Sequence, residues 1–112
     1  MKTWKSVPKK VVLACIDICD GHTIFPPDEF IKLGAPKELI DRVCKVHESN
    51  LDNPKGTIFN DAGGVIPLLK GVYGLQLLRI IANDLNVHYD SAFGRGTEAR
   101  RIKEAIHKEL GA

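Results

Sequence analysis

The chain lacks a large excess of charge of either sign, and this narrows the classes of partner to expect. Its 112 residues include 16 lysines and arginines against 14 aspartates and glutamates, which gives a net charge of +2. A nucleic-acid-binding protein often shows a strong basic excess. We therefore expect any contact with nucleic acid to depend on local clusters of basic residues, because phosphate neutralisation needs clustered charge.

Long apolar runs are also missing. The most apolar stretch, residues 65–82, contains Lys70 and Arg79, whereas a membrane-spanning helix needs about 20 nearly uncharged residues. The apolar run Val11–Ile16 follows several lysines but ends at Asp17, which is short for a secretory signal. We expect no membrane span, no membrane partner and no signal peptide.

Cysteine is scarce, with three residues at no dense spacing. An odd number of widely spaced cysteines argues against a disulfide framework, so we expect a reduced, cytoplasmic protein. The sequence has no internal repeat, no low-complexity segment and no collagen-like glycine period.

What is present is the composition of an ordinary globular domain. Apolar residues make up 44% of the chain and charged residues 27%, which suits a soluble protein with one core. We predict a mainly α fold, with residues 1–112 forming a single compact domain of four or five helices. A basic N-terminal arm at residues 1–7 and long loops at residues 50–66 and 87–96 would complete it.

The firmest helical patterns lie in three segments. Residues 36–49 and 97–110 each carry an apolar stripe at helical spacing, and residues 67–85 carry a wide apolar face that predicts the central helix. Gly71 and Gly74 disfavour the start of this central helix by about 1 kcal/mol each relative to alanine. The alternative is a helix that begins only near Tyr73.

Two other segments are less decisive. Residues 8–19 are either a helix or a strand, since a short apolar run is ambiguous by period alone, and we favour the helix. Residues 28–33 predict a short helix that ends at Gly34. A short hairpin or extended segment is expected near residues 16–25 or 57–59.

Cysteine and histidine recur at a spacing that suggests a metal site. Three sulfurs and two imidazoles would be enough for tetrahedral zinc. These residues fall on apolar helical faces, however, where cysteine usually behaves as a small hydrophobic residue. We expect core packing instead, and no cofactor; the candidate ligands are Cys15, Cys19, His22, Cys44 and His47.

A catalytic site would have to come from the two long loops. His88, Asp90 and Ser91 are neighbours in sequence, but a catalytic triad depends on convergence in space. The chain has no Gly-x-Ser-x-Gly motif. A small enzyme with its site in loops 60–64 and 88–96 therefore needs these loops to meet around Asp61, His88 and Asp90.

Nucleic-acid binding has two possible sources. The first is the basic C-terminal region together with the N-terminal arm. Arg95 and Gly96 precede the predicted helix 97–110, and the backbone amides at the start of that helix can hold an anion. The second is a helix-turn-helix layout formed by residues 28–33, Gly34 and residues 36–49, although its second helix carries as many acids as bases. The candidate residues of the first source are Arg95, Gly96, Arg100, Arg101, Lys103, Lys9 and Lys10.

Three functional hypotheses follow. We favour a non-catalytic protein-interaction module that acts through a helical face and self-associates, with a homodimer or another protein as the partner. The alternative is a small nucleic-acid-binding regulatory protein, and the third is the small enzyme. The first hypothesis needs solvent-facing apolar residues, and the second needs the two basic clusters on one side.

Overall fold

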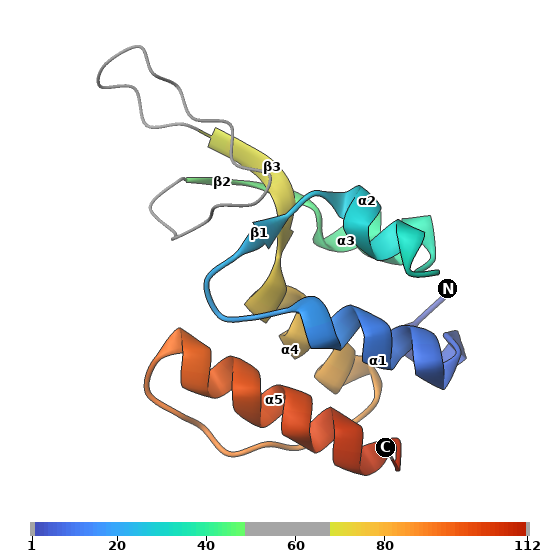
Figure 1. Cartoon of the computed structure of the whole chain (residues 1–112), viewed down its shortest axis with the longest axis vertical. Helices are drawn as coiled ribbons and strands as arrows, with labels where there is room; N and C mark the ends of the chain where they lie inside the picture. The colour runs from blue at the N-terminus through green and yellow to red at the C-terminus, as the bar shows by residue number, and fades with distance from the viewer. Residues whose placement is uncertain (1, 49–67, 112) are drawn as a thin grey trace.

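Helices supply most of the ordered backbone in the computed structural model, which describes residues 2–48 and 68–111 (Figure 1). The predicted mainly α, compact fold is confirmed. None of the described helices is long and apolar enough to span a bilayer. In chain order the elements are a 3-10 helix Trp4–Ser6, α1 Lys9–Ile18, β1 Ile24–Phe25, α2 Pro27–Lys32, α3 Lys37–Val43, β2 Lys45–Glu48, β3 Leu68–Tyr73, α4 Gly74–Asp84 and α5 Arg95–Glu109.

The ambiguous segment 8–19 is helical. α1 buries Val12, Cys15 and Ile16 on one face, and these positions are three and four residues apart, as the helical period requires. The strand alternative for this segment is therefore wrong. The expected extended segment near residues 16–25 is present as β1, whereas residues 57–59 and the expected loop 50–66 fall outside the described residues.

The helix expected over residues 67–85 is correct only in its second part. Residues 68–73 form β3, and the helix α4 begins at Gly74. A side chain at Gly71 would put its Cβ 2.7 Å from both the Ile24 side chain and the Phe25 carbonyl oxygen, so β1 approaches this backbone closely. Gly71 thus marks a strand packed tightly against its neighbour. The alternative prediction, a helix that begins only near Tyr73, is confirmed.

The helix expected over residues 36–49 also ends early. α3 stops at Val43, and residues 45–48 form β2. The register pairs Lys45 with Gly71 and Val46 with Lys70 in an antiparallel ladder. Pairing with a strand about twenty residues or more away in sequence overrides the local helical pattern. The spacing of apolar residues within one segment cannot reveal such a distant partner.

The three strands form one small antiparallel sheet in the order β1-β3-β2. β1 pairs with β3 through Ile24 with Tyr73 and Phe25 with Val72. β3 is therefore the central strand, and it leads directly into α4. Figure 1 shows β2 and β3 projecting together from the helical body.

α4 lies at the centre of the core, where it contacts α1, α5, β3 and the 3-10 helix. In Figure 1 the α2–α3 pair and the strands occupy one end of the molecule and α5 the other, with α1 between them. The predicted N-terminal arm is held against the body, because Trp4 is buried and its backbone N–H donates to the Asp84 carboxylate at 3.1 Å. The largest fully buried side chains are Trp4, Ile16, Ile24, Phe30, Leu39, Ile40, Leu75, Leu77, Leu78, Ile81 and Ile102.

Candidate nucleic-acid interface

Helices α2 and α3 are joined by a four-residue turn, 33–36, whose hydrogen bonds define its geometry. Gly34 has a φ of +105° and its N–H donates to the Ile31 carbonyl at 3.0 Å, while Ala35 N–H donates to the Phe30 carbonyl at 3.1 Å. This pair of bonds is the Schellman motif that ends many helices with glycine in the left-handed conformation. Pro36 then starts α3, since its backbone angle suits the first turn of a helix. Two helices joined by a short glycine-containing turn have the sequence layout of a helix-turn-helix.

The second helix of this unit has one buried and one exposed face. Leu39, Ile40 and Val43 are at most 1% exposed and anchor α3 to the core. The exposed face of α3 consists of Lys37, Glu38, Asp41 and Arg42. The helix therefore presents four charged side chains to solvent from a firmly held backbone.

These four side chains are partly paired with one another and with the N-terminal segment. Lys37 Nζ lies 3.0 Å from the Asp41 carboxylate, and Lys2 Nζ lies 3.3 Å from the Glu38 carboxylate. Arg42 Nη2 donates to the Lys2 backbone carbonyl at 3.2 Å. The pairs are exposed, so each is worth at most about 1 kcal/mol and can be exchanged for a partner in a complex.

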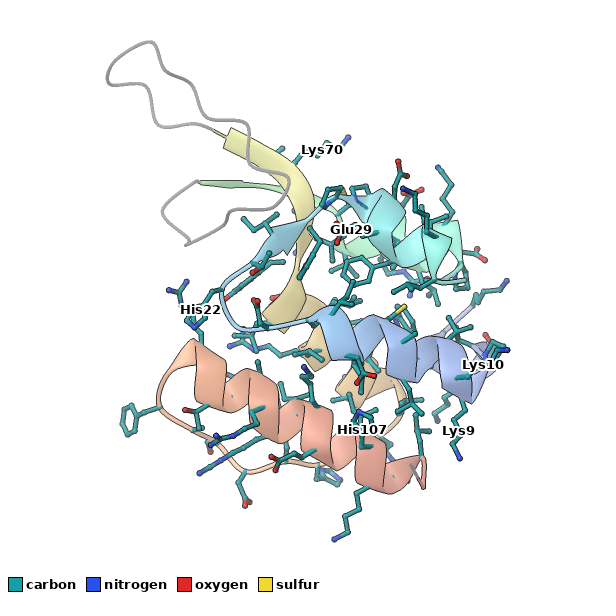
Figure 2. All side chains as sticks on the ribbon, in the orientation of Figure 1. Lys9, Lys10, His22, Glu29, Lys70 and His107 are labelled. Carbon is teal, nitrogen blue, oxygen red and sulfur yellow. The ribbon has the colours of Figure 1, made fainter. Side chains whose placement is uncertain are left out.

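The strands extend this surface. Lys45 follows α3 after a single residue and is exposed on β2. Its neighbour Val46 is 59% exposed and lies opposite Lys70 of β3. Because neighbours along a strand point to opposite faces, Lys45 and Lys70 lie on different faces of the β2–β3 ribbon. Figure 2 shows Lys70 directed away from the helical body.

The basic residues first singled out from the sequence lie elsewhere. Arg95, Gly96, Arg100, Arg101 and Lys103 belong to α5, at the opposite end of the molecule from α3 (Figure 1).

Several of the basic side chains on α5 are already bound within the chain. Lys103 Nζ donates to the backbone carbonyls of Asp17 and Cys19 at 3.3 and 3.1 Å, and Arg101 donates to the Ser91 carbonyl. Lysine near the last turn of α1 stabilises that helix end.

Lys9 and Lys10 open α1 and are exposed. Lys9 Nζ lies beside Gly111, 3.8 Å from where a Cβ on that residue would stand. Figure 2 shows both lysines at the end of α1 that adjoins the end of α5. The basic N-terminal cluster therefore adjoins the basic cluster on α5 only at one end of that helix.

A groove of about 320 Å³ separates α5 from the loop after α1. It is lined by charges of both signs, namely Asp20 from the loop and Arg100, Lys103 and Glu104 from α5, and by His22 and His107. His107 Nε2 lies 2.9 Å from the Asp17 carboxylate. Apart from the two histidines, two acidic residues balance the two basic residues that line this groove.

Asp20 organises the loop beside that groove. Its carboxylate accepts hydrogen bonds from the N–H groups of His22 and Thr23 at 2.8 and 2.7 Å and from the Thr23 hydroxyl at 2.7 Å. Burial raises the pKa of Asp20, but these hydrogen bonds together hold it below its usual value. Three hydrogen bonds to one carboxylate therefore define the shape of the loop where it packs against α5.

The candidate metal ligands are scattered among the elements. Cys15 and Cys19 are buried, and the Cys19 thiol donates to the Cys15 carbonyl. Cys44 lies between α3 and β2, and His22 lies in the loop beside α5. Among the described side chains, no group of three or more histidine, cysteine, aspartate or glutamate residues is arranged to hold a metal ion. The His47 side chain is outside that description.

Of the two proposed catalytic loops, the structure describes 88–96. His88 and Asp90 line an open hollow of about 500 Å³ together with Arg101 and Lys108. Asp61 and the loop 60–64 lie outside the described residues. The meeting of the two loops remains a prediction.

The wide apolar face predicted for an interaction surface is buried within the chain. Leu75, Leu77, Leu78, Ile81 and Ala82 of α4 are at most 1% exposed. Among the described residues the large hydrophobic side chains that reach solvent are Leu33, Val46 and Phe93. These three side chains are the exposed apolar contacts that the described part of the chain offers to a partner.

No family model, no curated protein and no solved structure matches the chain.

Proposed function

We propose that the protein is a small nucleic-acid-binding regulatory protein that binds duplex DNA through α3 and the adjacent β2–β3 ribbon. The observation that carries this proposal is the helix-turn-helix unit α2–α3, whose second helix exposes one whole charged face. In proteins built this way the second helix lies in the major groove and its N-terminal residues contact the base edges.

The strands support the same proposal. The helix-turn-helix α2–α3 is followed directly by the two-stranded ribbon β2–β3, and β3 also pairs with β1 in the sheet order β1-β3-β2. The major groove accepts an α-helix or a two-stranded ribbon, and a ribbon beside the helix can contact the neighbouring phosphates.

The basic residues around α3 outnumber its acidic residues by as much as they do over the whole chain, whose net charge is +2. Lys2, Lys37, Arg42 and Lys45 provide four positive charges near α3, against the two carboxylates of Glu38 and Asp41. This local excess of two charges is small. We therefore expect weak binding to random DNA that depends on only a few phosphate contacts.

Binding to a random duplex across a salt series tests the proposal. We expect affinity to fall with salt at a log–log slope of about −0.9 per phosphate contact. Replacing Lys37 and Lys45 together by alanine, which gives the α3 variant, should reduce that slope by roughly 1.8 if both contact phosphate. The matched control is Arg100→Ala with Lys108→Ala, which removes two exposed positive charges from α5.

Each outcome decides between surfaces. A flatter slope only for the α3 variant supports the helix-turn-helix interface. A flatter slope only for the α5 variant would assign binding to the basic C-terminal helix instead. Absence of binding at about 50 mM salt, where screening is weak, would contradict nucleic-acid binding altogether.

A second candidate function is self-association, and Phe93 is the observation that favours it. This side chain is wholly exposed beside an open hollow of about 540 Å³ that Ala92, Thr97 and Arg101 also line. A phenyl ring and a hollow on one patch suit a two-fold contact in which each copy uses the same surface. Light scattering at micromolar concentration should give a dimer mass that Phe93→Ser lowers, and a monomer mass for the unmodified chain would contradict this candidate.

We also propose a cytoplasmic location. All three cysteines are free, and cytoplasmic proteins keep their thiols reduced. A disulfide found in protein isolated from its host would contradict that location.

A further inference from the structure

The exposed face of α3 has a composition that bears on which bases it suits. Its four solvent-facing side chains are Lys37, Glu38, Asp41 and Arg42. They stand at the first, second, fifth and sixth positions of the helix. The first and fifth residues, and likewise the second and sixth, are four residues apart and therefore lie one turn apart on the same face. The face contains no asparagine or glutamine and no apolar side chain.

Each of these side-chain types has a preferred base. Arginine and lysine donate to the O6 and N7 atoms of guanine, while aspartate and glutamate accept from the N4 amino group of cytosine. Adenine is usually bound by asparagine or glutamine, and the methyl group of thymine by an apolar side chain. The face of α3 therefore matches G·C pairs and offers nothing that favours an A·T pair.

The acidic residues strengthen this selectivity. Glu38 and Asp41 repel phosphate, so they lower the affinity for DNA in which they find no donor. On a G·C pair the same carboxylate gains a hydrogen bond from cytosine. The difference in binding free energy between DNA with and without this cytosine is the source of specificity. In the free protein Asp41 is paired with Lys37, and both are well exposed, with side chains 54% and 75% accessible.

We propose that α3 recognises a G·C-rich core, with Arg42 contacting guanine and Asp41 contacting cytosine. This inference rests on the proposed function and specifies the sequence that it would recognise. Helix α3 has seven residues, and at about 1.5 Å per residue it is roughly as long as three stacked base pairs. The core should therefore span about three base pairs.

Selection of duplexes with a randomised centre by the full chain tests the inference. We expect the selected duplexes to share a G·C-rich core and to bind about tenfold tighter than the same duplex with one contacted pair changed to A·T. Selection of A·T-rich cores, or equal binding to all cores, would overturn the inference and leave the DNA-binding proposal standing. Absence of any DNA binding would overturn both.

Two substitutions make the assignment specific to single residues. Arg42→Lys keeps the charge but loses the planar, two-pronged guanidinium contact, so it should weaken the preference for guanine at one position and leave the preferences at the other positions of the core unchanged. Asp41→Asn should change the preferred base at one position from cytosine to adenine, because asparagine pairs with adenine.

Arg100→Lys on α5 is the matched control and should leave every preference unchanged. Thermal melts of all three variants check that each is folded. An Asp41→Asn variant that folds, binds DNA and selects the same core as the unmodified chain would overturn the assignment of Asp41.

Discussion

The three cysteines differ in their access to solvent, and their reactivity should differ accordingly. Burial raises the pKa of the Cys15 thiol to about 11, and burial also raises the pKa of Cys19. Because the thiolate is the reactive form, both thiols should be inert in the folded protein. Cys44 is only half-buried, at the junction of α3 and β2.

Thiol labelling of the native protein with Ellman's reagent should therefore modify Cys44 first. Cys44→Ser should abolish the fast phase, whereas Cys19→Ser should leave its amplitude unchanged. Unfolding in denaturant should expose the two slow thiols. Fast labelling of three thiols in the native state would contradict the burial of Cys15 and Cys19.

At the scale of the elements, α4 links the sheet to the helices. It continues directly from the central strand β3, and its apolar residues fill the space between α1 and α5. Arg79 leaves this apolar face and donates two hydrogen bonds to Glu98 of α5, at 2.7 and 2.9 Å. These hydrogen bonds lower the pKa of Glu98 and raise that of Arg79, so the pair stays charged at neutral pH.

Leu78→Ala should lower the free energy of unfolding by about 2–5 kcal/mol, because Leu78 is fully buried in α4. A urea melt measures this change. The matched control is Leu33→Ala at the end of α2, where the side chain is 37% exposed, and its effect should be within about 0.5 kcal/mol. A change of less than about half a kcal/mol at Leu78 would contradict its place in the core.

The element boundaries show how far one sequence can predict this fold. α1 and α5 follow from apolar positions three and four residues apart, and α2 follows from the prolines before it and Gly34 after it, all within two residues of the expected bounds. The strands β2 and β3 do not, because each depends on a partner distant in sequence and each adjoins a true helix. The apolar residues of these strands happen to fall at the spacing of the adjoining helices, so the helical patterns of 36–49 and 67–85 extended over them.

The candidate site was predictable in outline only. The turn at Gly34 and the two helices around it were visible as a possible helix-turn-helix, since glycine and proline mark such turns. The ribbon that follows α3 was missed along with its strands. Without it, the basic residues of α5 were the more prominent cluster, and no local pattern places α5 at the far end of the molecule from α3.

At the scale of the whole molecule, two distinct surfaces lie at opposite ends of one core. The α2–α3 unit and the ribbon form one end, and α5 with the loop containing Phe93 forms the other (Figure 1). If both proposals hold, a dimer formed through the second end would leave both copies of α3 free. Such a dimer would bind two half-sites related by its two-fold axis.

The stability of the whole molecule should depend on pH at the acidic side. The folded-state pKa values of Asp20 and Glu98 are both lowered, so the folded protein binds their protons less readily than the unfolded chain does. Their stabilising effect is complete above the unfolded values of about 4 and is lost as pH falls through the lowered folded values. The melting temperature should therefore decline from about pH 5 downward.

Asp20→Asn should reduce the melting temperature at pH 7 and make the decline in acid shallower, because the amide keeps the turn's shape but not its charge. Asp90→Asn is the control, since it removes an exposed carboxylate from the 87–94 loop. A decline equally steep in Asp20→Asn and in the unmodified chain would contradict the role of Asp20. Because the Asp20 turn joins α1 to β1 and packs beside α5, protonation of Asp20 should first loosen the packing of this turn against α5.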